Sequence, residues 1–249
     1  MENKLDVKIY ETRKEMGEAA AERVAEKINE LLAQKEEVNM IFAAAPSQNE
    51  VIETLIKKEI DWSRINAFHM DEYIGLGDDA PQSFGNFLKE KIFGRVPFKS
   101  VYYLNGNTPN PKEECERYAG LLKKYPADIV CMGIGENGHI AFNDPPVADF
   151  NDPELVKIVE LDAECRQQQV NDGCFASFGA VPTHALTLTV PALMAGKYLY
   201  CVVPGELKAP AVYNTLNQEQ SEKYPSTILR SHPNAILYLD KKSSSKVSE

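Results

Sequence analysis

The chain has 249 residues, of which 43% are hydrophobic and 26% charged, a balance typical of a globular protein with a sizeable core. Its formal net charge of −10 argues against a nucleic-acid-binding surface, and an anionic ligand would need a local positive site. No apolar run is long enough for a transmembrane helix, and the polar start predicts no signal peptide. The five cysteines are scattered, without a C-x-x-C pair, so we expect a reducing cytoplasm and no zinc site.

Strand-like and helix-like segments alternate along the chain. We expect strands at residues 6–10, 38–44, 64–70, 129–132, 185–190, 198–203 and 235–239. Helices are expected at residues 14–35, from near 48, and at 83–93, 112–125 and 206–216. Ser47 would cap the second of these helices, with Glu50 completing a capping box. Residues 145–183 look irregular, and we expect them to form an insertion over the site or a lid.

The order of these elements predicts a single domain. The chain contains no internal repeat, no low-complexity linker and no charge block that would mark a boundary. We therefore expect one doubly wound α/β domain over residues 1–240, built on a single, mostly parallel sheet with helices on both faces. Residues 241–249 are rich in serine and lysine and are expected to form a frayed tail.

One run of residues, 133–146, has the composition of a functional site. It follows a short apolar strand and contains His139 together with three glycines, Gly133, Gly135 and Gly138. Glycine lets the backbone approach a ligand closely, and open α/β sheets bind ligands at the carboxyl ends of their strands. A lone histidine beside a tight turn is also often structural. The paired prolines, with Asn143 and Asp144 before them, restrict the loop and favour a site.

A second run, Met70-Asp-Glu-Tyr-Ile-Gly-Leu76, also comes directly after a strand. Asp71 would then lie at the carboxyl end of that strand and face the same crevice as His139. Two carboxylates followed by an aromatic residue fit a solvated turn equally well. The presence of both runs in one chain favours the functional interpretation.

Together the two runs resemble the glucosamine-6-phosphate deaminase/isomerase family, whose fold is Rossmann-like. The resemblance covers nearly the whole chain, because it includes Tyr103-Leu-Asn-Gly-Asn107, Ala185-Leu-Thr-Leu-Thr189 and Gly205-Glu-Leu-Lys208. It implies an enzyme of amino sugar catabolism, which we expect to be a hydrolase. Such an enzyme opens the ring of glucosamine 6-phosphate, moves a proton between C2 and C1, and releases ammonia to give fructose 6-phosphate. This chemistry requires no cofactor and no metal.

The resemblance also implies catalytic roles for four residues. His139 matches the ring-opening residue, and an imidazole pKa near 6.5 suits proton transfer in both directions. Asp71 matches the base for the C2/C1 proton, which requires a dry pocket that raises its pKa. Asn137 and Asp144 match two positions that orient or relay protons to the histidine. Asn137 stands where aspartate is common and Asp144 where glutamate is usual, and a side chain set back by about 1 Å costs roughly a hundredfold in rate unless the backbone compensates.

The expected phosphate site departs further from the family pattern. The family has a Gly-rich loop after its second strand, where this chain has Ala43-Ala-Ala-Pro-Ser47. We expect the Ser47 hydroxyl and backbone amides, at Ala44, Ala45 and Gly135, to contact the substrate. Lys208 matches the family's phosphate lysine.

Other cationic residues are weaker candidates. Arg166 lies where the family has an arginine-bearing segment, and we expect it to bind substrate; Arg230 is weaker still. His69, His184 and His232 are interpreted as structural or as neighbours of the site.

Several alternatives remain open at this stage. Galactosamine 6-phosphate is an alternative substrate, and the residues do not decide between deamination and simple isomerisation. The 6-phosphogluconolactonases share the Gly-x-Gly-x-x-Gly-His core, but carry Asp-Glu-Arg where this chain has Asp71-Glu72-Tyr73. A non-catalytic sugar-phosphate sensor would suit the altered loop, although binding alone needs neither Asp71 nor His139. We expect a small sugar phosphate as partner, with no nucleic acid or membrane, and the oligomeric state stays open, a homo-oligomer included.

Overall fold

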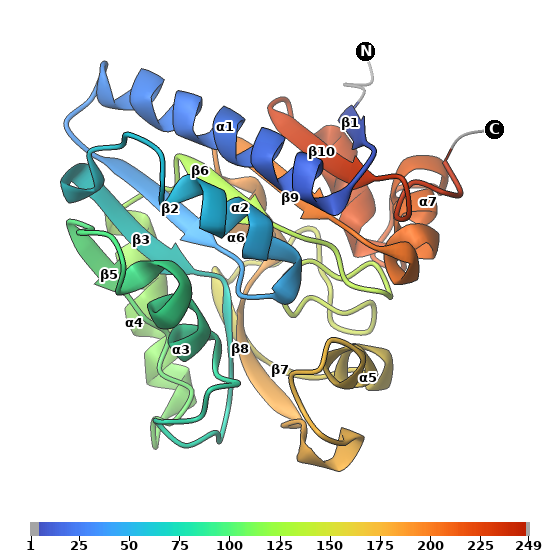
Figure 1. Cartoon of the computed structure of the whole chain (residues 1–249). Helices are drawn as coiled ribbons and strands as arrows, with labels where there is room; N and C mark the ends of the chain where they lie inside the picture. The colour runs from blue at the N-terminus through green and yellow to red at the C-terminus, as the bar shows by residue number, and fades with distance from the viewer. Residues whose placement is uncertain (1–4, 248–249) are drawn as a thin grey trace.

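The computed structural model describes residues 5–247, which form a seven-stranded parallel sheet and a separate three-stranded sheet (Figure 1). All strand pairs of the large sheet are parallel. Its order is β1 (Asp6–Tyr10), β10 (Ala235–Asp240), β9 (Tyr198–Val203), β6 (Ile129–Met132), β2 (Val38–Phe42), β3 (Ile65–His69) and β5 (Ser100–Tyr102). The expected doubly wound α/β fold is confirmed.

The strand order reverses between β2 and β6. From β2 the chain builds outward through β3 to β5, and then returns to place β6 on the other side of β2. In open α/β sheets, ligands bind at the carboxyl ends of the strands beside such a reversal. The loop 43–47 follows β2, and the loop 133–139 follows β6. The topology therefore brings the loops 43–47 and 133–139 to one crevice.

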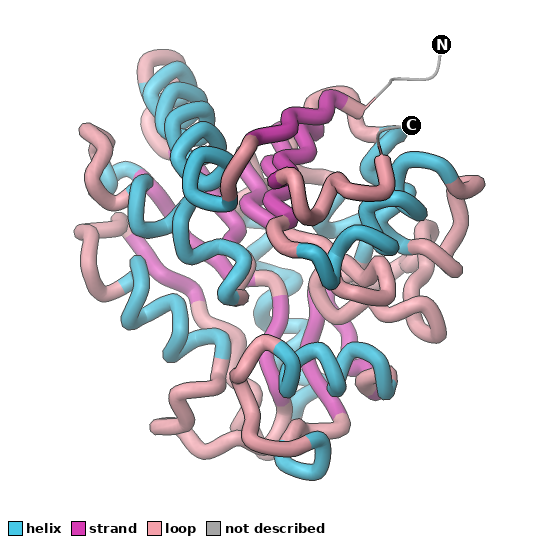
Figure 2. Tube along the Cα trace, turned by 45° about the vertical axis from the view of Figure 1, so that its right-hand side comes forward, coloured by secondary structure: helices cyan, strands magenta, loops and turns pink. Residues whose placement is uncertain are grey.

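Helices cover both faces of the large sheet, so the strands lie in the interior (Figure 2). Side chains alternate between two cores, because successive residues of a strand point to opposite faces. Met40 and Phe42 of β2 pack in the core with α1 (Arg13–Leu32) and α2 (Asn49–Leu55), whereas Ile41 packs in the other core. That second core includes residues of α4 (Pro111–Lys124), α6 (Val190–Met194) and α7 (Ala209–Asn217).

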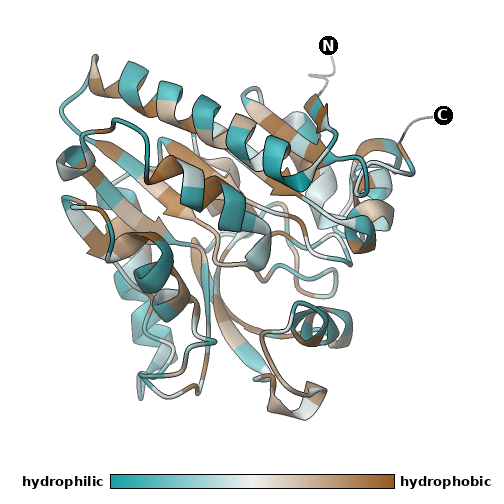
Figure 3. Ribbon diagram, viewed as in Figure 1, coloured by the Kyte–Doolittle hydropathy of each residue, from teal (hydrophilic) through white to brown (hydrophobic). Residues whose placement is uncertain are grey.

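Helix α1 has a well-defined start and a narrow contact with α2. The Thr12 hydroxyl accepts a hydrogen bond from the amide of Glu15, whose side chain accepts one from the amide of Thr12, which makes a capping box. Its polar face is teal and its inner face brown in Figure 3. Gly17 faces α2 so closely that a Cβ there would lie 2.4 Å from the Cβ of Glu50. This close approach sets the start of α1 beside the loop that follows β2.

The small sheet is antiparallel and was not expected as a separate unit. Its order is β4 (Asp71–Tyr73), β8 (His184–Leu188) and β7 (Val156–Glu160), with Asp71 opposite Thr187. β8 was expected to join the large sheet. β7 and α5 (Ala163–Asn171) lie inside the segment 145–183 that looked irregular. The expectation that this segment is irregular was wrong. It arose because α5 is largely polar and shows almost no apolar periodicity.

The expected cap at Ser47 was also wrong. A short 3-10 turn, Pro46–Gln48, precedes α2, and no side chain caps either element. The Ser47 hydroxyl instead accepts a hydrogen bond from Gln48 Nε2 at 3.2 Å. It is therefore not committed to a helix start.

The remaining elements are short. They are α3 (Phe84–Leu88), which continues into a π-helical turn (Lys89–Phe93), and 3-10 turns at Trp62–Arg64, Phe178–Ala180, Glu206–Lys208 and Pro225–Ser231. Residues 241–247 of the tail form turns in which the Ser243 amide donates to Asp240 Oδ1 at 2.7 Å, and Ser243 is buried. Among the helices of residues 5–247, none has the length and apolar character that crossing a membrane requires.

Candidate active site

A cavity opens at the carboxyl ends of β2, β3 and β6. Together with the open space at its mouth it spans about 740 Å³. The loops after these strands and after β9 contribute to its wall, together with the start of α1 and one face of α5. The polar and charged residues that line it are Arg13, Ser47, Asp71, His139, Gln168, Gln169, Asp172 and Lys208.

Asp71 begins β4 and is 6% exposed. Burial raises the pKa of its carboxyl well above the usual range, and the negative charges of Glu72 and Asp144 raise it further. This agrees with the dry environment expected for a carboxylate that acts as a base. The ring of His69 contacts the Asp71 carbonyl oxygen at 2.9 Å, which fixes the backbone of this residue.

The loop after β6 holds His139 against the cavity. The Gly135 amide donates to the His139 carbonyl oxygen at 2.9 Å, so this amide is used within the loop. A Cβ at Gly135 would lie 2.1 Å from His139 Cε1, and Gly138 has a φ of +86°. Only glycine leaves room for the imidazole at the first position, and glycine is favoured at the second. The contribution of Gly135 is thus the space that it leaves.

Asn137 and Asp144 both contact the His139 ring. Asn137 Oδ1 lies 2.7 Å from Nδ1 and Asp144 Oδ1 lies 3.1 Å from the same nitrogen. Both oxygens accept, so Nδ1 carries a proton and Nε2 is left free to accept one. Burial opposes the ionisation of Asp144, but hydrogen bonds from His139, the Asp162 amide and Asn137 lower its pKa overall. The shorter aspartate therefore reaches the histidine without a gap.

The backbone after His139 explains how the shorter side chain reaches. Ala141 has a φ of 47°, which turns the chain sharply. Asn143 Nδ2 then donates to the carbonyl oxygens of Ile140 and Leu188, both at 2.9 Å. These bonds hold the turn closed, so Asp144 is drawn toward the ring.

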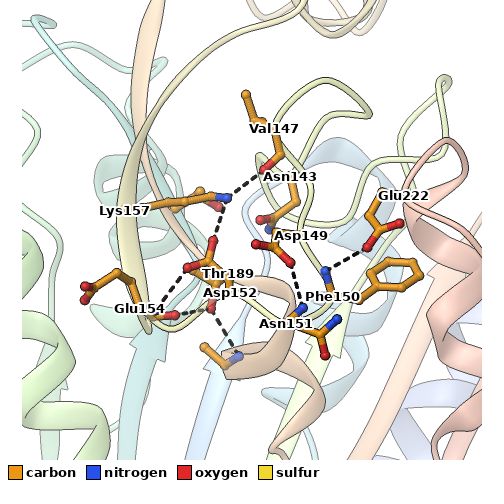
Figure 4. Close-up of polar contacts among 12 residues, drawn as sticks. Asn143, Val147, Asp149, Phe150, Asn151, Asp152, Glu154, Lys157, Thr189 and Glu222 are labelled. Carbon is orange, nitrogen blue, oxygen red and sulfur yellow. Dashed lines mark hydrogen bonds and ion pairs between the residues drawn. The ribbon is translucent and has the colours of Figure 1, made fainter.

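The segment after Asp144 is fastened to the body by polar contacts (Figure 4). Lys157 Nζ donates to the Val147 carbonyl oxygen at 2.6 Å and pairs with Asp152 Oδ2 at 2.8 Å. The Thr189 hydroxyl donates to the Glu154 carbonyl oxygen at 2.7 Å. These contacts hold residues 147–157 together and link them to Thr189, and the expectation that residues 145–183 form an insertion over the site or a lid stays a prediction.

Helix α5 forms a polar wall of the cavity. Gln168, Gln169 and Asp172 lie on its inner face at helical spacing. Gln168 Oε1 accepts from the Glu136 amide at 2.7 Å, whereas the Gln169 side chain makes no hydrogen bond within residues 5–247, although only 6% of the residue is exposed. None of the three was expected from the sequence, because α5 has almost no apolar periodicity by which it could be predicted.

Arg166 does not reach the cavity. Its Nη2 donates to the carbonyl oxygens of Phe178 and Val181, at 3.0 and 2.9 Å, and its guanidinium lies 4.1 Å from the centre of the Phe178 ring. On α5 it lies about 160° around the helix axis from Gln168, because successive helical residues differ by about 100°. Its contacts are structural, and Arg230 likewise donates to backbone carbonyl oxygens, those of Leu216 and Gln218.

Other residues of the cavity are suited to an anion. Lys208 is 8% exposed, and burial lowers its pKa, although Asp172 and Glu136 oppose this effect. Ser47 lines the same cavity. Within the described residues, the amides of Ala44 and Ala45 donate no backbone hydrogen bond. Arg13 was not foreseen from the sequence, because it lies far from both motifs at the start of α1.

One cluster has donor types that could bind a metal, which the sequence did not indicate. Single ligand atoms of His139, Asp144 and Cys165 lie within 4.8 Å of one another. Burial raises the pKa of the Cys165 thiol well above its usual range, with Asp144 adding to the effect. The thiol is therefore neutral, and the other two residues already contact each other through Nδ1 and Oδ1. We assign the cluster to the surroundings of His139.

Comparison with known families identifies the chain. The model of the glucosamine-6-phosphate isomerases/6-phosphogluconolactonase family matches residues 11–238. The chain belongs to this family. The resemblance noted in the two sequence runs is therefore confirmed.

Curated relatives and solved structures agree with this assignment. The chain is 37% identical to a glucosamine-6-phosphate deaminase of Bacillus cereus over 222 residues, 89% of this chain and 83% of the relative. It is 35% identical to one of Bacillus thuringiensis over 245 residues, 98% and 90% of the two chains. A monomeric glucosamine-6-phosphate deaminase superposes with a TM-score of 0.88 at 28% identity, covering 97% of this chain and 99% of that one. The expectation of an enzyme is confirmed.

A more distant structure supports the fold alone. The 6-phosphogluconolactonase of Thermotoga maritima superposes with a TM-score of 0.79 at 21% identity, over 96% of this chain and all (100%) of that one. One expectation is overturned by the comparisons, namely the hydrolase class. The family model is named for glucosamine-6-phosphate isomerases and 6-phosphogluconolactonase, and the curated relatives are named glucosamine-6-phosphate deaminases, so the isomerase/deaminase description replaces that of a hydrolase.

Proposed function

We propose that this family member is a glucosamine-6-phosphate deaminase, which converts its substrate to fructose 6-phosphate and ammonia. The observation that carries the proposal is one cavity lined by a buried carboxylate, Asp71, an oriented imidazole, His139, and a buried cation, Lys208. An aldose–ketose proton transfer needs the first two groups, and a sugar phosphate needs the third.

Ring opening falls to His139. Asn137 and Asp144 hold Nδ1 as a donor, so Nε2 can accept the proton of the C1 hydroxyl and return it to the ring oxygen. The positive charge that forms on the imidazole in between is stabilised by Asp144, whose lowered pKa keeps it ionised at neutral pH. This arrangement supports the relay role given to the shorter aspartate.

Asp71 then acts on carbon. In its ionised form the carboxylate removes the proton from C2 of the open chain and delivers it to C1, which leaves an imine at C2. Water then adds to C2, and ammonia leaves as the C2 carbonyl of fructose 6-phosphate forms. A raised pKa makes the carboxylate a stronger base and lessens the mismatch with a carbon acid. Its burial also keeps water away from the proton during the transfer.

The phosphate group is bound by a different set of residues in the same cavity. Lys208, Ser47, Ala44 and Ala45 line it, and their ammonium, hydroxyl and amide groups can donate to phosphate oxygens. All five cysteines are free, which fits our expectation of a reducing cytoplasm as the site of action.

The test is ammonia release from glucosamine 6-phosphate, with galactosamine 6-phosphate assayed alongside and Asp71→Asn as the control variant. We expect release from glucosamine 6-phosphate that the variant abolishes while still binding the sugar phosphate. Ammonia release from galactosamine 6-phosphate alone would show that the galacto epimer, and not glucosamine 6-phosphate, is the substrate. Hydrolysis of 6-phosphogluconolactone, with silence on both amino sugars, would refute the deaminase assignment.

A further inference from the structure

We infer that Arg13 is a second cation of the phosphate site and binds the substrate phosphate together with Lys208. This inference rests on the proposed sugar-phosphate substrate, and it concerns a residue from the first helix, far in sequence from either motif.

The start of α1 holds Arg13 at the edge of the cavity. Thr12 caps the helix, so Arg13 is its first residue. The close approach of Gly17 to Glu50 fixes the helix against α2. As a result, the Arg13 side chain lines the same cavity as Ala44, Ala45 and Lys208.

Only some of the N–H groups of the Arg13 guanidinium donate to acceptors of the described chain. Nε donates to Glu50 Oε1 at 2.6 Å, and Nη2 donates to the Pro46 carbonyl oxygen. A guanidinium has five N–H donors, and Nη1 has no acceptor among residues 5–247. The anchored part holds the loop of Pro46, while the remaining donors are available to a ligand in the cavity.

The charge of the ligand requires more than one lysine. A phosphate monoester carries roughly −1.5 to −2 at neutral pH. Apart from His139, the cationic side chains that line the cavity in the described part of the chain are Arg13 and Lys208, and the carboxylates of Asp71 and Asp172 line it as well. With a net charge of −10 on the whole chain, Lys208 alone would not balance the phosphate.

The loop itself offers few donors. Pro46 has no N–H, so this position cannot contribute an amide to an anion. Arg13 compensates in two ways: it holds the Pro46 carbonyl group away from the phosphate, and it presents a planar fork that matches phosphate oxygens. Its side chain is 40% exposed, so a ligand can reach it without displacing the core.

The test compares Arg13→Gln and Arg13→Lys with Arg23→Gln. Arg23 lies on the same helix, where it pairs with Glu26 and Glu30 away from the cavity. The measurements are KM and kcat for glucosamine 6-phosphate, the inhibition constant of inorganic phosphate, and inorganic phosphate binding by calorimetry. Thermal unfolding reports whether each variant is folded.

We expect Arg13→Gln to raise KM and the phosphate inhibition constant together, by about tenfold or more, the effect of losing a charge-assisted hydrogen bond. The value of kcat should stay within about threefold, because Arg13 does not approach the reacting carbons. For Arg13→Lys, KM and the phosphate inhibition constant should lie between those of Arg13→Gln and the wild type. Both values for Arg23→Gln should match the wild type. A phosphate inhibition constant that stays unchanged in folded Arg13→Gln would overturn the inference, whatever happens to kcat.

The outcomes also separate this inference from the proposed function. Ammonia release with phosphate affinity independent of Arg13 would refute the inference alone. Phosphate binding that depends on Arg13, without ammonia release from either hexosamine phosphate, would refute the deaminase function and support the anion site. Wild-type protein that neither binds phosphate nor releases ammonia would refute both.

Discussion

The ring of His69 joins the backbone of Asp71 to that of Leu104. Nε2 accepts a hydrogen bond from the Leu104 amide at 2.9 Å, so the ring proton is on Nδ1, which donates to the Asp71 carbonyl oxygen at 2.9 Å. His69 is fully buried, and burial lowers its pKa to about 4. A neutral imidazole thus positions the proposed base.

This histidine should make the protein sensitive to acid. Between pH 6.5 and about 4 the unfolded chain binds a proton at His69 that the folded protein does not, so the free energy of unfolding falls as the pH falls. The loss is up to about 3 kcal/mol. We expect urea unfolding at pH 7 and pH 5 to show about 2 kcal/mol of this loss in the wild type and a smaller loss in His69→Gln.

Glu72 has the opposite effect on the pH dependence of stability, and it is present in both the wild type and His69→Gln. Burial raises its pKa to about 7, although amides of Gly85, Phe84 and Tyr73 oppose this, so its contribution to stability falls as the pH rises from 4.5 to about 7. The difference between wild type and His69→Gln therefore isolates the histidine. Equal pH dependence in the two proteins would contradict the role given to His69.

Asp144 should support proton transfer by His139. Replacing Asp144 with Asn removes the charge that stabilises the imidazolium, so we expect kcat to fall about 10- to 100-fold. Asp149→Asn is the control, because this exposed carboxylate of the same segment accepts only from the Asn151 amide among residues 5–247. A kcat of Asp144→Asn equal to that of Asp149→Asn would exclude Asp144 from the relay.

Gln169 should contribute to substrate binding. Its amide lines the cavity without a partner in the described chain, so a sugar hydroxyl can satisfy it. We expect Gln169→Ala to raise KM about 5- to 10-fold with a smaller change in kcat. Gln167→Ala, on the exposed side of the same helix, should leave KM unchanged. Equal KM values for the two variants would show that Gln169 does not contact the sugar.

Lys208 should anchor the phosphate. We expect Lys208→Gln to raise KM by about tenfold or more, with kcat much less affected, because the lost contact is made equally in the ground and transition states. Lys223→Gln serves as a control outside the cavity. If KM stayed the same, the phosphate would have to be held elsewhere.

Most of the large sheet was predictable from the sequence, whereas β5 and the small sheet were not. Strands such as β2 and β6 are short, mostly apolar runs buried on both faces, which few other structures explain. The strand β4 has only three residues, and α5 carries glutamines toward a polar cavity, so neither has the apolar pattern on which prediction depends.

The site was predictable only where it follows strands of the large sheet. Asp71 and His139 come directly after β3 and β6, and the topology brings such positions together. Arg13 and Gln169 reach the cavity through the packing of whole helices, which no local motif records. Arg166 illustrates the same limit, because the orientation of one helix decided which of its side chains faces the cavity.

The adjacent carboxylates of Asp71 and Glu72 on β4 have different roles. Asp71 faces the cavity, while the Glu72 carboxylate accepts hydrogen bonds from the amides of Tyr73, Phe84 and Gly85 and ties two loops together. Three residue pairs with β8 set which of the two points inward. A shift of one residue in that pairing would turn Glu72 toward the cavity and Asp71 away from it, with the amino-acid sequence unchanged. The catalytic role proposed for Asp71 therefore depends on strand register as much as on sequence.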